Sequence, residues 1–409
     1  MMKSKGSFLK AGHLPTLISA FLYFDVSFMV WILLGVLGNY LAADMRLNPA
    51  QQGLMTALPL LGGAALRLVL GTLTDIIGGR KTGLIGMALT VLPLLLGWLW
   101  ADSISEIYLV GLLLGVAGAS FAVAMPLTSR WYPAEHKGLA MGIAGTGNSG
   151  TVLSTLFAPR LAEAFGWHSV FGLALIPLAV VAVIFFLFAK DAPNSLKKSE
   201  TTEYAAVLKE KDTYSFCLFY GVTFGGFVGL ASFLSIFLRD QYGVSGIMAG
   251  DLTTVCVAVG SFIRPLGGWL ADQWGGLRML MVLYSAMVLL LLGLTLLPAL
   301  GVTVALLFLV MVCLGVGNGS VFQLVPQRFA GHVGVATGLI GAAGGIGGFF
   351  FPMLMGWTRQ ASGTYALGLG IFAAATLLAL VVLLMVQREW VGLWLAAGGR
   401  AKPSALASA

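Results

Sequence analysis

The sequence predicts an all-α membrane protein with twelve transmembrane helices in two six-helix halves. An apolar composition, a length that divides into twelve spans, and a set of motifs that occurs twice support this fold class. Hydrophobic residues make up 58% of the 409 residues and charged residues only 10%, against about 25% in soluble domains. With a mean hydropathy of +0.95, the composition excludes a soluble enzyme and a disordered chain. The net charge of +7 is not gathered into a basic patch, so we expect no nucleic-acid partner.

Twelve apolar runs, each bounded by charges or turn residues, are long enough to cross a bilayer. An even division leaves about 34 residues per run, enough for one helix of about 20 to 25 residues and a short loop. We expect the spans at 14–43, 50–76, 82–101, 106–129, 138–165, 168–190, 213–239, 246–272, 278–299, 302–328, 332–361 and 364–388.

The basic residues predict the orientation of these spans. If the N-terminus is cytoplasmic, 17 of the 23 Lys and Arg residues lie on the cytoplasmic side. This asymmetry predicts that both termini are cytoplasmic. One long polar connection, 191–212, separates an N-terminal bundle (1–190) from a C-terminal bundle (213–388), and 389–409 forms a cytoplasmic tail.

The two halves carry the same motifs in the same order. Arg67-x3-Gly71-x3-Asp75-x2-Gly78-Gly79 recurs as Arg264-x3-Gly268-x3-Asp272-x2-Gly275-Gly276, displaced by 197 residues at all five positions. Two further pairs of glycine-rich stretches follow, displaced by 196 and 200 residues. Parallel six-helix repeats place a substrate site near the bilayer midplane, between the halves.

The stretch from Gly71 to Lys81 resembles the loop motif of the major facilitator superfamily. The resemblance implies that fold, and it implies a gating role at the cytoplasmic face for Gly71, Asp75, Gly79, Arg80, Asp272 and Gly276. Asp75 lies at a helix end beside Arg80 and Lys81, so we expect it to pair with them or to cap the helix. A plain basic loop that only orients the chain is the alternative.

Arg67 and Arg264 are predicted to lie deep in the membrane at equal depths. Arg67 lies eight residues before Asp75, which corresponds to about 12 Å along a helix. A charge at that depth costs at least about 2.5–3.5 kcal/mol, so each arginine needs a cavity or a counter-charge. No matching pair of acids is present, and guanidinium forks suit planar oxyanions. We therefore expect an anion site, with structural pairing to helix-end acids as the alternative.

Glycines gather in spans five and eleven, with Asn148 among them. Most of the glycines are explained by close helix packing, and they also leave backbone accessible to a small ligand. Asn148 has little packing use, so we expect it to donate to an oxyanion, the alternative being an interhelical hydrogen bond.

These stretches resemble the two signature stretches of the nitrate/nitrite porter family. They read Gly145-Thr-Gly147-Asn148-Ser-Gly150 and Gly341-Ala-Ala-Gly344-Gly345-Ile-Gly347-Gly348, and the contexts of both arginines fit the same family. In that family arginines bind nitrate or nitrite, phenylalanines sandwich it, and a tyrosine and an asparagine add hydrogen bonds. The resemblance implies substrate contacts at Arg67, Arg264, Asn148, Tyr220, Phe28, Phe121, Phe224, Gly118, Gly147 and Gly344. Each phenylalanine alone is as readily explained as a lipid or core contact.

Asp25 is an acid within the first span. A carboxylate in a membrane span is by default a proton or ion handle, and the family includes proton-coupled porters. Three interpretations remain open: proton coupling, a counter-charge for an arginine, and a cap or loop contact.

We therefore expect a monomeric transporter of nitrate, and of nitrite as a second substrate, in the inner membrane, coupled to protons and without a cofactor. Nitrate/nitrite exchange without protons is the closest alternative. An organic-anion or drug carrier and a non-transporting sensor are the others. No nucleophile–base pair, metal cluster or phosphate loop suggests an enzyme.

Overall fold

The computed structural model describes residues 8–193, 201–329 and 332–395, and their regular structure is helical. The first half contains α1 (Phe8–Ala11), α2 (Leu14–Trp31), α3 (Leu33–Val36), α4 (Gly38–Met45), α5 (Pro49–Ile77), α6 (Gly79–Leu99), α7 (Ile104–Gly118), α8 (Phe121–Ser129), α9 (Ala134–Gly145), η1 (Thr146–Ser149), α10 (Gly150–Phe165) and α11 (Trp167–Phe188). The second half contains α12 (Thr201–Lys209), α13 (Lys211–Tyr242), α14 (Gly246–Phe262), α15 (Arg264–Trp274), α16 (Gly276–Thr295), α17 (Leu300–Arg328), α18 (Val333–Ser362) and α19 (Ala366–Leu393).

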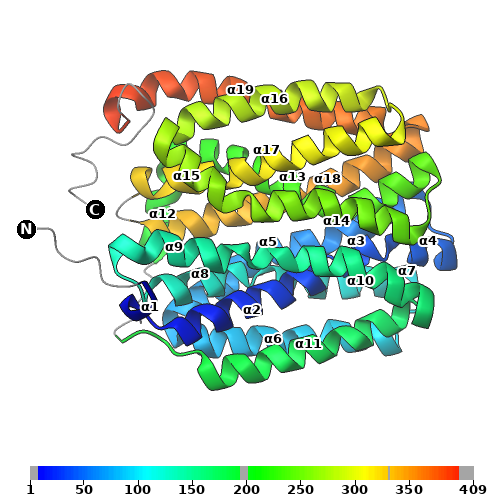
Figure 1. The fold of residues 1–409 in the computed structure, drawn as a ribbon, viewed down its shortest axis with the longest axis horizontal. Helices are drawn as coiled ribbons and strands as arrows, with labels where there is room; N and C mark the ends of the chain where they lie inside the picture. The colour runs from blue at the N-terminus through cyan, green and yellow to red at the C-terminus, as the bar shows by residue number, and fades with distance from the viewer. Residues whose placement is uncertain (1–7, 194–200, 330–331, 396–409) are drawn as a thin grey trace, which may run out of the picture.

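The long helices run side by side along one direction, with α1 and α12 at one end of the bundle and α4 at the other (Figure 1). In this view the first half occupies the lower part and the second half the upper part, and α5 and α18 lie between them (Figure 1). The predicted all-α membrane fold is confirmed. Eleven helical stretches within the described ranges are long and apolar enough to cross a membrane.

The fifth predicted span, 138–165, is present as three pieces: α9, the 3-10 turn η1 and α10. The break lies where α2 approaches most closely. A Cβ at Gly147 would lie 2.6 Å from Phe24 Cδ1, and one at Gly150 would overlap the backbone carbonyl of Asp25. Glycine at these positions lets the two segments touch, because a side chain would push them apart.

Local chemistry explains where α5, the helix that carries Arg67, begins. The side chain of Asn48 accepts from Gln51 N at 2.9 Å, while the Gln51 side chain accepts from Asn48 N at 3.0 Å. Pro49 follows at the first helical position, where a missing N–H has no cost. This reciprocal capping satisfies backbone donors that the first turn would leave unpaired.

The halves are joined near the end of the bundle that carries α4, the predicted extracellular end. Arg160 forms two bonds to Asp251, of 2.8 and 3.0 Å, between α10 and α14. Asn39 Nδ2 donates to Ser235 O at 2.9 Å, between α4 and α13. Side chains and backbone carbonyls from both halves thus hold this end together.

Space remains in the middle of the molecule, beside the signature glycines. Gly145 and Gly341 occupy equivalent positions of the repeat, and both are buried. Even so, a Cβ on either would have no described neighbour within 4 Å, apart from its own helix and chain neighbours. Each half therefore has a buried signature glycine with open space beside it.

Candidate functional site

Arg67 lies on α5 and is only 2% exposed. Its Nε donates to Gly118 O at 3.1 Å, and its Nη1 donates to Gly341 O at 2.6 Å. Gly118 belongs to the first half and Gly341 to the second, so this guanidinium bridges the halves. Its Nη2 is buried and has no protein partner among the described residues. One N–H edge of a buried cation is therefore available to a ligand.

Aromatic rings surround this guanidinium. Its central carbon lies 4.8 Å from the centre of the Phe224 ring, 5.4 Å from that of Trp31 and 5.7 Å from that of Phe121. Rings at these distances attract a cation through their negative faces and exclude water. Trp31 was not predicted as a member of the site. Its indole donates to Pro59 O at 2.7 Å, which holds it against α5.

Arg264 is the first residue of α15, directly after the break that follows α14. Its Nη2 donates to Tyr220 Oη at 3.3 Å, while its buried Nη1 has no partner in the described part of the chain. Phe121 lies 5.8 Å and Phe322 6.0 Å from its central carbon. Phe121 therefore contacts both arginines, which brings the two predicted cations to one ring.

Tyr220 and Phe224 stack in parallel, with centres 4.9 Å apart and planes within 5°. Phe322 packs edge-on against Tyr220 at 4.7 Å. A Cβ at Gly344 would lie 2.5 Å from Tyr220 Cδ1 and 2.9 Å from Phe224 Cδ1. Glycine at this position is what allows the stacked pair to lie against α18. Phe322 is a further member that the sequence analysis missed.

The remaining predicted aromatic and glycine positions support this cluster from the first half. Phe28 lies between Phe24, at 4.4 Å, and Trp31, at 4.8 Å, so it supports the rings around the arginines without contacting an arginine itself. Gly118 faces the indole of Trp31 so closely that a Cβ there would overlap it.

Asn148, in η1, is 1% exposed, and neither its Nδ2 nor its Oδ1 has a partner among the described residues. An amide buried without partners costs about 1–3 kcal/mol, so a ligand or water that bonds to it is favoured. The alternative, an interhelical hydrogen bond, is not formed within the described ranges, so the Asn148 amide is available as a donor to an anion.

Asp25 is half-buried on α2 and accepts from Ser149 Oγ at 2.6 Å. Ser149 is the chain neighbour of Asn148. Within the described ranges no ion pair joins Asp25 to Arg67 or to Arg264. In the structure Asp25 therefore bonds to Ser149 of η1 rather than to an arginine.

The charged residues of the gating motif, Asp75 and Arg80, have other partners than the sequence analysis expected. Asp75 pairs with Arg130, at the end of α8, and not with Arg80 or Lys81. Arg80 turns away: its backbone N–H donates to Asp191 Oδ1 at 3.2 Å, and its Nη2 donates to Phe186 O at 2.7 Å. The prediction of pairing within the loop was wrong because α8 and α11 supply nearer partners.

The glycines of the motif allow helices to pack closely. A Cβ at Gly79 would lie 2.9 Å from Leu127 Cβ, whereas one at Gly71 would lie 3.7 Å from Ala122 Cβ, an ordinary contact that leaves room for a methyl group. In the second half, a Cβ at Gly276 would lie 2.6 Å from Gln323 Oε1. Asp272 is exposed, and no ion pair to it is formed within the described residues.

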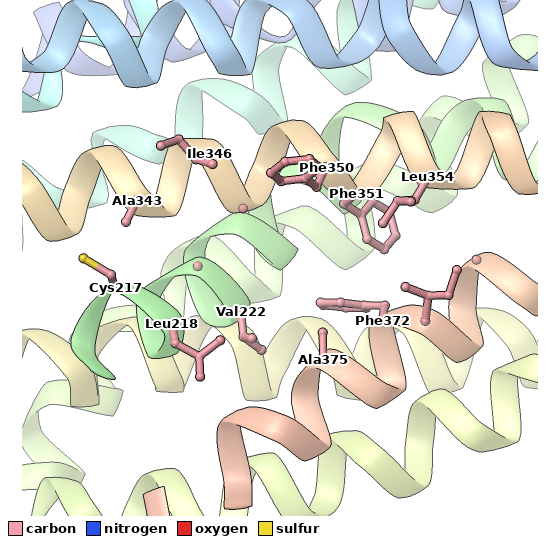
Figure 2. Close-up of a pocket in the computed structure, with 14 residues that line it drawn as sticks. Cys217, Leu218, Val222, Ala343, Ile346, Phe350, Phe351, Leu354, Phe372 and Ala375 are labelled. Atoms are coloured by element: carbon pink, nitrogen blue, oxygen red, sulfur yellow. The ribbon is translucent and has the colours of Figure 1, made fainter. Parts of the chain in front are cut away.

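A cavity of about 370 Å³ lies between α13, α18 and α19. Figure 2 shows its walls, which include Cys217, Ile346, Phe350 and Phe372, and no labelled side chain carries nitrogen or oxygen. It offers nothing that would stabilise a desolvated anion, so we place the candidate site at the arginines instead.

Comparison with known proteins places the chain in a family. The family model described as Major Facilitator Superfamily matches residues 19–352. A nitrite extrusion protein of Bacillus subtilis is 36% identical, over 87% of this chain and 90% of its own length. A protein of Mycobacterium tuberculosis described as a probable nitrate/nitrite transporter is 34% identical, over 92% and 98%. A probable nitrate transporter of Staphylococcus carnosus is also 34% identical, over 95% and 98%.

The fold agrees with a solved structure. A bacterial homologue of the human lysosomal transporter Spinster, in an inward-facing and occupied conformation, superposes with a TM-score of 0.68. The match covers 95% of this chain and 98% of that one, at 20% identity. The motif pairs, the helical halves and the relatives agree: the chain is a multi-pass membrane protein, not an enzyme, and it belongs to the nitrate/nitrite porter family of the major facilitator superfamily.

Proposed function

We propose that this protein transports nitrate, and nitrite as a second substrate, across the inner membrane by alternating access. Both termini lie in the cytoplasm in this proposal, the protein acts as a monomer, and uptake is coupled to protons. The observation that carries it is the pair of arginines around one phenylalanine. Each arginine has an unpartnered buried N–H group, and neither has an acid partner among the described residues. The names of the relatives point to the same substrates.

The site suits a small planar anion. Two guanidiniums held near one ring repel each other, and burying them without counter-charge is costly. An anion between them removes most of that cost, and its planar oxygens match the N–H edges of arginine. The rings of Phe121, Phe224 and Phe322 line the space as flat apolar walls and exclude water.

Substrate-dependent movement follows from where Arg67 is bound. Its Nη1 bond to Gly341 O ties the first half to the second. An anion that draws the guanidinium away from this carbonyl weakens a contact between the halves. Reorientation then depends on the presence of substrate, as alternating access requires.

The bond between Ser149 and Asp25 supports a coupling role for Asp25. A proton on Asp25 changes the charge beside the turn that carries Asn148. Anion and proton then bind together and leave together, and acid outside the cell favours uptake.

Exchange of nitrate for nitrite without protons is the second candidate, because one relative is described as a nitrite extrusion protein. Proteoliposomes separate the two. We expect nitrate uptake into vesicles without internal nitrite, driven uphill by an acidic exterior. Uptake that requires internal nitrite and ignores the pH gradient would replace symport with exchange.

A further inference from the structure

Asn318 is a second buried amide without partners. It lies within α17, is 1% exposed, and neither Nδ2 nor Oδ1 has a partner in the described part of the chain. The neighbouring Ser320 does bond within the same helix: its Oγ, two residues on, donates to Val316 O at 3.0 Å. Asn318 makes no such bond, so packing within the helix does not explain its amide.

The neighbours of Asn318 along α17 show which way it faces. Gly317 packs against Thr223 of α13, and Gly319 packs against the backbone of Arg264, where a Cβ would lie 2.5 Å from the carbonyl oxygen. At about 100° of rotation per residue, Asn318 lies between these two contact faces. Phe322 lies one turn further, about 40° away around the helix, and faces Tyr220 and Arg264. Asn318 therefore faces the candidate anion site.

The repeat gives a second reason to place Asn318 beside Arg264. Asn318 is the counterpart of Gly118 at the displacement of 200 residues. In the first half Gly118 O accepts from Arg67 Nε at 3.1 Å. In the second half the corresponding residue carries an amide, and Arg264 Nη1 has no partner among the described residues. Where the first half has the Arg67–Gly118 bond, the second half thus has an unused arginine donor and an unused amide.

Each arginine leaves one buried guanidinium nitrogen without a partner among the described residues. Arg67 donates through Nε and Nη1 to carbonyls, and Arg264 donates through Nη2 to Tyr220, so the unpartnered nitrogens are the NH2 groups at Arg67 Nη2 and Arg264 Nη1. Each half also contributes one buried amide without a partner, Asn148 in the first and Asn318 in the second.

We propose that Asn318 is a further substrate-binding residue of this site. With the anion bound, its Oδ1 accepts from one N–H of Arg264 Nη1, whose second N–H stays available to the anion, and its Nδ2 donates to an oxygen of the bound oxyanion. This inference rests on the proposed function, since it concerns how the same anion is held. It satisfies the two amide atoms and the unused arginine donor together.

The test is calorimetric titration of nitrate into purified full-length protein in nanodiscs. We expect Asn318→Ala to weaken nitrate binding about tenfold, equivalent to about 1.4 kcal/mol. Asn318→Asp should abolish it, because a carboxylate pairs with Arg264 and repels the anion. The matched control is Ser320→Ala, which removes a hydroxyl bonded only to its own helix, and we expect it to bind nitrate as the wild type does.

Thermal melting without nitrate separates binding from folding. A structural role predicts that Asn318→Ala melts lower while its folded fraction binds nitrate with unchanged affinity, and that result would overturn the inference. So would nitrate binding of wild-type strength in Asn318→Asp. Wild-type protein that binds no nitrate would instead overturn the proposed function itself.

Discussion

Arg67 and Arg264 occupy the same position of the same motif, yet their surroundings differ. Arg67 lies within the continuous helix α5, is almost wholly buried, and is held by two backbone carbonyls, one from each half. Arg264 begins α15 beside a helix break, is half-buried, and bonds to the hydroxyl of Tyr220. One arginine is bonded to backbone, and the other to a side-chain hydroxyl.

The helix break explains the difference. Pro265 follows Arg264 and has no backbone N–H, so the hydrogen-bond ladder of α14 cannot continue through it. α14 therefore ends at Phe262, and Arg264 lies at the start of α15 rather than within a continuous helix. The comparison teaches that a sequence repeat preserves residue type and depth without preserving mechanical role. We infer that Arg67 anchors the anion and that Arg264 follows it.

The largest effect is expected from the arginines. Arg67→Lys and Arg264→Lys keep the charge but lose the fork, so each should nearly abolish nitrate transport with normal insertion. Only Arg67→Lys should also lower the melting temperature clearly, because it loses two buried bonds to carbonyls. Uptake in proteoliposomes and thermal melting measure both, with exposed Arg278→Lys as control. Uptake above half of wild type in either variant would contradict the two-arginine site.

Gly344→Ala tests the side chain that holds Arg264. The new methyl group would meet Tyr220 and Phe224, and overpacking of this kind costs about 1–3 kcal/mol. We expect reduced nitrate affinity and transport, because Tyr220 must leave Arg264. Gly338→Ala, on the same helix, adds a methyl group with no described neighbour within 4 Å and should be close to neutral. Equal effects of the two changes would refute a steric role for Gly344.

Asn148→Ala tests the buried amide of the first half, which also carries Arg67. We expect nitrate binding to weaken by about 1–3 kcal/mol, the cost of a lost buried hydrogen bond. Calorimetric titration gives the number directly. Thr146→Val is the control in the same turn, since its hydroxyl bonds to Ile143 O of the preceding helix. Unchanged affinity in Asn148→Ala would make the residue structural.

Asp25→Asn is expected to change nitrate affinity least. The variant resembles the protonated acid permanently, so it should still bind and exchange nitrate. It should lose concentrative uptake driven by an acidic exterior, because no proton can leave with the anion. Flux in proteoliposomes with and without a pH gradient is the measurement, and exposed Asp102→Asn is the control. Concentrative, pH-driven uptake that persists in Asp25→Asn would remove Asp25 from coupling.

Much of the site was predictable from local signals. An arginine in an apolar run, an aromatic pair four residues apart at Tyr220 and Phe224, and an amide among glycines are visible without any long-range contact. The structure brings Arg67, Arg264, Phe121, Tyr220 and Phe224 together, while their roles in transport remain predictions. Phe28 shows where this kind of prediction fails: it was expected to contact the substrate, but its ring packs against Phe24 and Trp31.

The sequence alone determined the apolar spans, their predicted orientation and the repeated arginines, because hydropathy, flanking charge and helical spacing are local properties. Only the tertiary structure decided which groups meet. Asp75 pairs with Arg130 rather than its loop neighbours, and Trp31 and Phe322 join the site from other helices. These contacts depend on where helices cross and on glycines that let backbones touch. A linear pattern does not encode such distances, since each is set by two segments far apart in the chain.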